Sequence, residues 1–157
     1  MTTLVEIEEH RTLDDYEAVA HLAPAVRDLR DEASRVVPRL EGRTIWMVNS
    51  TSRGGGVAEM LPTMVTLLRD LGIRTEWVTI ESEAPEFFAL TKRIHNLIHG
   101  EGDPALPANA REVYEAVNRA NAEPLTRLMK PGDILVVHDP QPMSLAAAIK
   151  EHLDIKA

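Results

Sequence analysis

The order of elements expected along the chain predicts an α/β fold with a doubly wound, mostly parallel sheet flanked by helices. Segments 43–49 and 134–142 contain short apolar runs, and 73–80 alternates between apolar and polar residues. All three are predicted as strands, the last ending in a polar tip. Stretches with helical spacing of apolar residues separate them. The strand cores IWMV and ILVV lack polar alternation, which is typical of strands covered on both faces. Right-handed crossovers then bring the carboxyl ends of the strands to one edge, where such sheets bind ligands.

The first forty residues are predicted to be helical. Apolar residues recur there at steps of three and four, at Val19, Leu22, Val26, Leu29, Ala33 and Val36. This stripe fits one helix, or two helices broken near Pro24, and Pro38 and Gly42 end it. We therefore expect an N-terminal helical segment at residues 1–42 and the sheet-containing domain at residues 43–157.

Four further helices are expected, three between the strands and one after the last strand. The first has apolar positions from Val57 to Leu71 and starts late or bends at Pro62. The second covers 85–100, with Phe88, Thr91, Ile94, His95 and Ile98 at helical spacing. The third covers 109–129 and is expected to break at Pro124. The last follows the third strand, with Pro142 in its first turn.

Composition limits the classes of function. The chain has 157 residues, 44% hydrophobic and 27% charged, as in one ordinary globular domain. Its formal net charge of −8 argues against nucleic acids and anionic membranes as partners, because they select basic surfaces. The absence of cysteine excludes disulfides, thiolate metal sites and a cysteine nucleophile. The acidic N-terminus does not resemble a signal peptide, and no apolar run could span a bilayer, so a cytoplasmic location is expected.

Three consecutive glycines, Gly54, Gly55 and Gly56, stand between the first strand and the following helix. Glycine permits positive φ and close approach of a ligand, and free N–H groups at a helix start attract phosphate. A tight turn without a ligand would use glycines in the same way, and both interpretations stay open. The loop has neither the Gly-Lys-Ser/Thr ending of a P-loop nor the spaced glycines of dinucleotide folds, which argues against an oxidoreductase.

Polar residues after the third strand are the second candidate site. His138 and Asp139 follow ILVV directly, so the fold places them at the same edge as the glycines. A histidine there can exchange hydrogen bonds with a sugar hydroxyl or a phosphate. The alternative is that Asp139 caps the last helix and His138 packs in the core.

A third group of polar residues lies on the predicted helix 85–100. Lys92 and Asn96 share a face at i, i+4, and His95 lies beside them; a solvated surface is the alternative. His95 and His99 also have a metal-binding spacing, but no carboxylate lies between them as in HExxH sites. No metal site is therefore predicted.

Three blocks together resemble a known family: VNSTSRGGGVAEMLPTMVTLLRDLGIRTEWVTI, EFFALTKRIHNLIHG and GDILVVHDPQP. In this order, and over about residues 40–145, they resemble the N-terminal half of retaining glycosyltransferases of the two-Rossmann-domain (GT-B) type. Within that group they look most like the trehalose glycosyltransferring synthases. The resemblance implies a Rossmann-like domain that is one half of a GT-B architecture. It also implies transfer of glucose from a nucleotide-glucose donor to a small sugar acceptor, without a metal or other cofactor.

The resemblance also implies roles for individual residues. His138 would reach the sugar at the reaction centre. The donor's phosphates and sugar would be bound by Gly54, Gly55 and Gly56, with charge from Arg53. The acceptor would lie near Lys92, His95, Asn96 and Asp139.

Length departs from the family pattern. A GT-B enzyme needs two domains, about twice this length. We therefore expect a piece of such an enzyme, or a stand-alone relic, inactive or nearly so without a C-terminal Rossmann domain. The other class of function left open is a non-catalytic α/β binding or oligomerisation module that keeps the glycine loop for structure. Association of identical chains is also left open.

Overall fold

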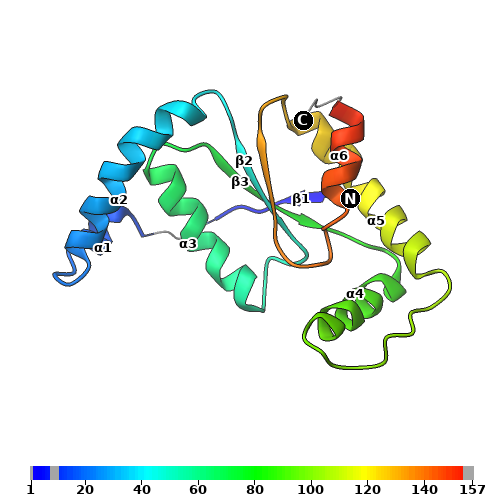
Figure 1. Ribbon diagram of the computed structural model, residues 1–157. Coiled ribbons are helices and arrows are strands. Elements are labelled where there is room, and N and C mark those ends of the chain that lie inside the picture. Colours follow the sequence, from blue (N-terminus) through cyan, green and yellow to red (C-terminus); the bar gives the residue numbers. More distant parts are fainter. Residues whose placement is uncertain (1, 8–10, 154–157) are drawn as a thin grey trace.

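A four-stranded mixed sheet flanked by helices forms the centre of the computed structural model, which describes residues 2–7 and 11–153 (Figure 1). The strand order is β1-β3-β2-β4. The strands are β1 (Thr2–Leu4), β2 (Ile45–Asn49), β3 (Thr75–Ile80) and β4 (Ile134–Val137). β2 pairs in parallel with both β3 and β4, whereas β1 runs antiparallel to β3. The predicted α/β class with a mostly parallel sheet is confirmed.

The N-terminal segment begins with a strand that the sequence analysis did not predict. β1 pairs Thr2 with Ile80 and Leu4 with Val78. Its three residues are too few to show a period. It is stabilised by tertiary pairing, and the hydroxyl of Thr2 also donates to the carbonyl of Asn121 at 2.8 Å. Residues 1–42 are therefore not wholly helical, and the division at residue 42 stays a prediction.

Two helices and a 3-10 turn follow, so of the two alternatives the broken helix is confirmed. They are α1 (Leu13–Glu17), α2 (Ala23–Val36) and η1 (Val37–Leu40). The side chain of Thr12 caps α1, with Asp15 completing a capping box. Pro24 lies in the first turn of α2, where its missing N–H costs nothing.

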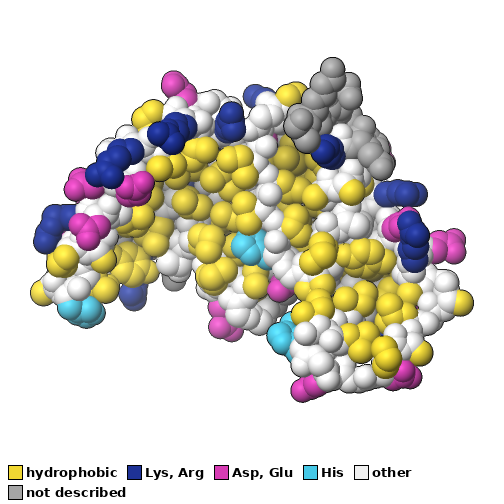
Figure 2. All heavy atoms as spheres, in the orientation of Figure 1, with side chains coloured by type: hydrophobic (Ala, Val, Ile, Leu, Met, Phe, Trp, Pro, Cys, Tyr) yellow, Lys and Arg dark blue, Asp and Glu magenta, His cyan; other side chains and the backbone are white. Residues whose placement is uncertain are grey.

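The apolar stripe predicted from Val19 to Val36, most of which lies on α2, is more exposed than its period implies. Val26 is buried, but Val19, Leu29 and Val36 are 40%, 43% and 38% exposed. Figure 2 shows hydrophobic side chains gathered over the region between α2 and α3 on the face turned to the viewer. Periodicity identifies residues that share a face, and it does not determine what covers that face.

Two cores form on opposite faces of the sheet because successive strand residues alternate in direction. Trp46 and Val48 face one core, together with buried residues of α5 (Ala110–Leu128) and α6 (Leu145–Leu153). Met47 faces the other, which is built on α3 (Gly56–Asp70). Among the described strands β4 pairs with β2 alone, at the end of the sheet, so Ile134–Val137 are half-buried rather than fully covered. Figure 1 shows α3 and α2 on one side of the sheet and α5 and α6 on the other.

Prolines interrupt neither long helix. α5 is continuous through Pro124, so the break predicted there is wrong. α3 begins at Gly56 and contains Pro62, so it does not start late. A proline removes one helical hydrogen bond, but the neighbouring turns retain theirs. Buried Ala122 and Leu125 flank Pro124 in the core, and this packing stabilises the helix across the missing bond.

The second half of the domain differs from prediction at two helix positions. In α4 (Pro85–Ile98) the buried residues are Phe87, Leu90 and Thr91, whereas Phe88 and Ile98, expected on the apolar stripe, are 41% and 65% exposed. α6 begins at Leu145, so Pro142 precedes the helix instead of lying in its first turn. Within residues 2–7 and 11–153, no helix combines the length and apolar character needed to span a membrane.

Candidate functional site

The two strongest candidate segments leave neighbouring strands at the same edge of the sheet. Val48 of β2 lies opposite Val137 of β4 in parallel register. The main-chain N–H of His138 continues this pairing and donates to the carbonyl of Val48 at 2.8 Å. The glycine loop follows β2 and leads into α3, while His138 and Asp139 follow β4. The expected placement at one edge is therefore seen, and the roles of these residues stay predictions.

The glycine loop contains two glycines that the backbone requires and one that it does not. Gly54 and Gly55 have φ of 73° and 88°, which favours glycine. Gly55 is the N-cap of α3 and has no side-chain capping bond. Gly56 lacks a positive φ, and a Cβ there would meet nothing within 4 Å. Since glycine is a poor helix former, neither backbone shape nor packing in the described chain explains Gly56.

Asn49 anchors the start of this loop and was missed by the sequence analysis. Its side chain is fully buried, with the Oδ1 atom accepting from Trp77 Nε1 at 2.8 Å. Its Nδ2 donates to the carbonyl of Thr51 at 2.6 Å. The available signal was a polar residue ending an otherwise apolar strand. Arg53 lies exposed in the same loop, next to the glycines.

His138 is half-buried on the α3 side of the sheet. Its Nε2 lies 3.4 Å from the sulfur of Met47, which belongs to the α3-side core. Burial lowers the pKa of His138, and the negative charge of Asp139 opposes this by raising it. The net direction is downward, so the imidazole is neutral at neutral pH and can accept or donate one hydrogen bond.

Asp139 is exposed and has φ of 69°, in the left-handed region that non-glycine residues rarely adopt. It stands well before Leu145, the first residue of α6. The alternative in which Asp139 caps the last helix is therefore wrong.

Three of the four acceptor candidates, Lys92, His95 and Asn96, lie on α4, which follows β3 at the same edge of the sheet. Lys92 is exposed, and His95 and Asn96 are half-buried. The ring centroids of His95 and His99 lie 4.6 Å apart. Among the described residues, no hydrogen bond or ion pair joins the side chains of these three candidates to the glycine loop or to His138. The topology therefore brings them to the same edge without direct contact.

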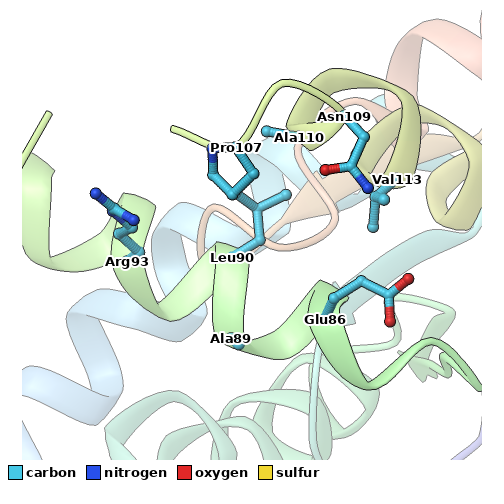
Figure 3. A pocket seen from close by; sticks show the side chains of 8 residues that line it. All are labelled: Glu86, Ala89, Leu90, Arg93, Pro107, Asn109, Ala110 and Val113. Atoms are coloured by element: carbon cyan, nitrogen blue, oxygen red, sulfur yellow. The ribbon is translucent and has the colours of Figure 1, made fainter. Parts of the chain in front are cut away.

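A separate cavity of about 200 Å³ lies between α4 and α5 (Figure 3). Leu90, Pro107 and Val113 give it apolar walls, with Glu86 at its side. Arg93 also lines it and donates to the carbonyl of Asp103 at 3.0 Å. At 3.6 residues per turn, Lys92 and His95 project from a different face of α4. The cavity is therefore not the predicted acceptor site.

Metal-ligating side chains do not gather in the part of the chain that the structure describes. No group of three or more His, Asp or Glu side chains there could hold an ion. His95 and His99 form a pair without a third ligand of these types.

Known proteins match most of the chain. Residues 47–155 match the family model described as "Trehalose synthase, N-terminal domain". Over 133 residues the chain is 41% identical to a trehalose synthase of Rubrobacter xylanophilus, covering 85% of this chain and 30% of that protein. Over 135 residues it is 39% identical to a trehalose synthase of Pyrococcus horikoshii, covering 86% of this chain and 31% of that protein.

A more distant similarity extends to another named activity. The chain is 30% identical over 114 residues to a trehalose phosphorylase of Pleurotus pulmonarius, covering 68% of this chain and 15% of that protein. The chain thus spans about 30% of the length of the trehalose synthases it matches.

Proposed function

The chain belongs to the family of trehalose synthase N-terminal domains, and from that premise we propose that it forms the acceptor-side portion of a retaining glycosyltransferase. The proposed reaction moves glucose from a nucleotide-glucose donor to a small sugar acceptor. Glucose is the first acceptor to test. The remaining length of the relatives is proposed to supply most contacts to the nucleotide.

One observation carries this proposal: Gly56 and His138 stand at the same edge of the sheet, and the fold does not require glycine at position 56. A Cβ on Gly56 would project into open space. A phosphate or sugar packed against that backbone gives a reason for glycine there. The non-catalytic module gives none, because a structural turn needs glycine only at Gly54 and Gly55, where φ is positive.

The chemistry of glucosyl transfer fits the groups at this edge. Transfer leaves negative charge on a diphosphate, and unpaired main-chain N–H groups at the start of a helix stabilise such charge. α3 supplies that helix start, and Arg53 adds a positive charge beside it. A neutral His138 can hydrogen-bond to a hydroxyl of the glucose being transferred.

The acceptor is proposed to bind toward Lys92, His95 and Asn96, with Asp139 at the end of β4. Their ammonium, imidazole, amide and carboxylate groups can donate to or accept from sugar hydroxyls. The names of the phosphorylase relatives contain the same disaccharide, trehalose. This supports a glucose-containing ligand at the acceptor site. They also favour a second candidate, in which inorganic phosphate occupies the glycine loop and trehalose is cleaved.

A titration followed by NMR tests the proposal and separates the two candidates. The chain alone provides one wall of a cleft, so we expect a dissociation constant of about 1 mM and no turnover. Nucleotide-glucose should shift the amides of Gly54, Gly55 and Gly56 and the ring of His138. If phosphate with trehalose produces these shifts and nucleotide-glucose does not, the phosphorylase candidate is favoured. Absence of shifts at these residues with either ligand at millimolar concentration would leave the glycine loop as a structural turn.

A further inference from the structure

Two side chains of α5 bind the loop that carries the candidate histidine. The hydroxyl of Tyr114 donates to the carbonyl of Pro140 at 2.6 Å. The Nδ2 of Asn118 donates to the carbonyl of Gln141 at 3.1 Å and to the carbonyl of Tyr114 at 2.9 Å. Asn118 is 1% exposed, so its amide is held in the protein interior. Neighbouring carbonyls of the loop are thus fixed to neighbouring turns of one helix.

The loop has a shape that requires such support. Asp139, directly before Pro140, has φ of 69°. A non-glycine residue in this region persists when the surrounding structure over-determines it, and such residues cluster at functional sites. The carbonyl held by Tyr114 belongs to the residue that follows Asp139, so the hydrogen bond acts next to the unfavourable backbone.

His138 is the residue on the other side of Asp139. Its main-chain N–H is bound to Val48, and its ring lies against Met47. The strand therefore holds one end of the 138–141 segment, and α5 holds the other.

We propose that Tyr114 and Asn118 are positioning residues, which hold the loop after β4 in the conformation that lets His138 meet a bound sugar. This inference rests on the proposed function, because it assigns the purpose of the contacts to ligand binding by His138. It predicts that Tyr114 and Asn118 act without touching the ligand themselves.

The hydroxyl of Tyr114 can be separated from its packing role. The ring is half-buried and stacks on Phe87 at 6.1 Å between centroids. Tyr114→Phe keeps this packing and removes the donor to Pro140. Tyr16→Phe is a matched control, since Tyr16 is the other tyrosine of the chain and its hydroxyl makes no hydrogen bond within the described residues.

Hydrogen exchange and ligand titration together test the inference. The main-chain N–H groups of Met143 and Ser144 also hydrogen-bond to the Tyr114 hydroxyl. In Tyr114→Phe we expect these two amides to exchange about tenfold faster, as for one lost hydrogen bond of ordinary net strength. With nucleotide-glucose, the His138 ring shift should fall at least about threefold, while the amide shifts of Gly54 and Gly56 persist. Tyr16→Phe should match the unsubstituted chain in both readouts, and the thermal midpoints of all three should agree within a few degrees.

Two results would overturn the inference, and they differ from failure of the proposed function. Unchanged exchange in the loop would show that the hydroxyl does not hold it. Faster exchange with an undiminished His138 response would show that the held conformation does not serve binding. If the unsubstituted chain gave no shift at either the glycines or His138, the proposed function would fail, and the positioning role assigned to Tyr114 and Asn118 would fail with it.

Discussion

The main-chain N–H of His138 donates to the carbonyl of Val48 at 2.8 Å, which extends the parallel pairing of β2 and β4 by one step beyond the last residue of β4. Two loops therefore leave the sheet side by side, one with three glycines and one with a histidine. Parallel sheets bind ligands at this edge because helix starts and loop backbones converge there. The proposed function depends on this adjacency.

Gly56→Ala tests whether a ligand, and not the fold, requires glycine at the start of α3. Because φ is not positive and a Cβ meets nothing within 4 Å, we expect the variant to be as stable as the parent, or more stable by up to about 1 kcal/mol. We expect nucleotide-glucose binding to weaken about tenfold because the methyl group occupies the ligand's space. Urea unfolding and NMR titration measure the two effects.

Gly72→Ala is the matched control for this prediction. Gly72 has φ of 83° after the end of α3, so alanine there is strained, and about 1 kcal/mol of stability should be lost. Its ligand affinity should not change. Equal loss of stability in both variants would mean that Gly56 serves the fold.

The stability of the chain should depend on pH through His138. Its pKa in the folded chain lies below the ordinary value because burial disfavours the charged ring. The unfolded chain therefore binds more protons as the pH falls below about 6.5, so stability is lost from that pH down to the folded pKa. We expect His138→Gln to show a smaller loss than the parent between pH 7.5 and 5.5 in urea unfolding. Identical pH dependence in the two chains would contradict the direction of this shift.

Asp133 should stabilise the start of two strands. Its carboxylate accepts from the N–H of Thr44 at 2.9 Å, from Trp46 Nε1 at 3.0 Å and from the N–H of Lys130 at 2.9 Å. Burial raises the pKa of Asp133, but these hydrogen bonds outweigh it and lower the pKa overall. Asp133→Asn should cost about 1–2 kcal/mol at pH 7, reduced by the partial exposure of the site.

The stabilisation by Asp133 should weaken as the pH falls. A lowered pKa means that the stabilisation is present above the unfolded pKa of an aspartate and is lost as the pH falls through the folded value. The difference in unfolding free energy between parent and Asp133→Asn should therefore shrink from pH 7 to pH 3. A constant difference would show that the charge of Asp133 contributes nothing.

The apolar stripe of α2 should tolerate truncation at its exposed positions. Leu29 is 43% exposed, so Leu29→Ala should change the free energy of unfolding by no more than about 0.5 kcal/mol. Leu61 is fully buried in α3, and Leu61→Ala should cost about 2–5 kcal/mol. Thermal unfolding of the two variants compares these losses. A large loss of stability in Leu29→Ala would mean that the apolar stripe of α2 is covered in solution.

Most of the fold could be predicted because the helices and three of the strands have a clear apolar pattern. β2 and β4 follow from short apolar runs, β3 follows from alternation, and the edge of the sheet follows from the topology of parallel strands. β1 could not be predicted because its three residues depend on pairing with β3. The break expected at Pro124 was wrong because core packing on both sides of it outweighs one lost hydrogen bond.

The candidate site was predictable where chemistry and position coincide in the sequence. His138 follows directly after an apolar strand, and Gly54, Gly55 and Gly56 lie in the short loop after another, which marks them as edge residues. The residues that hold them were not predictable. Asn49 contacts Trp77, and Tyr114 contacts Pro140, across separations that no local pattern reveals.

The most direct test of the account is whether one bound molecule reaches both loops. Nuclear Overhauser contacts between nucleotide-glucose and the chain, measured together with the titration, provide it. We expect contacts from the glucosyl protons to the ring of His138, and shifts at the amides of Gly55 and Gly56 that give the same dissociation constant. Contacts at one loop alone, or two different dissociation constants, would contradict a shared site at the ends of β2 and β4.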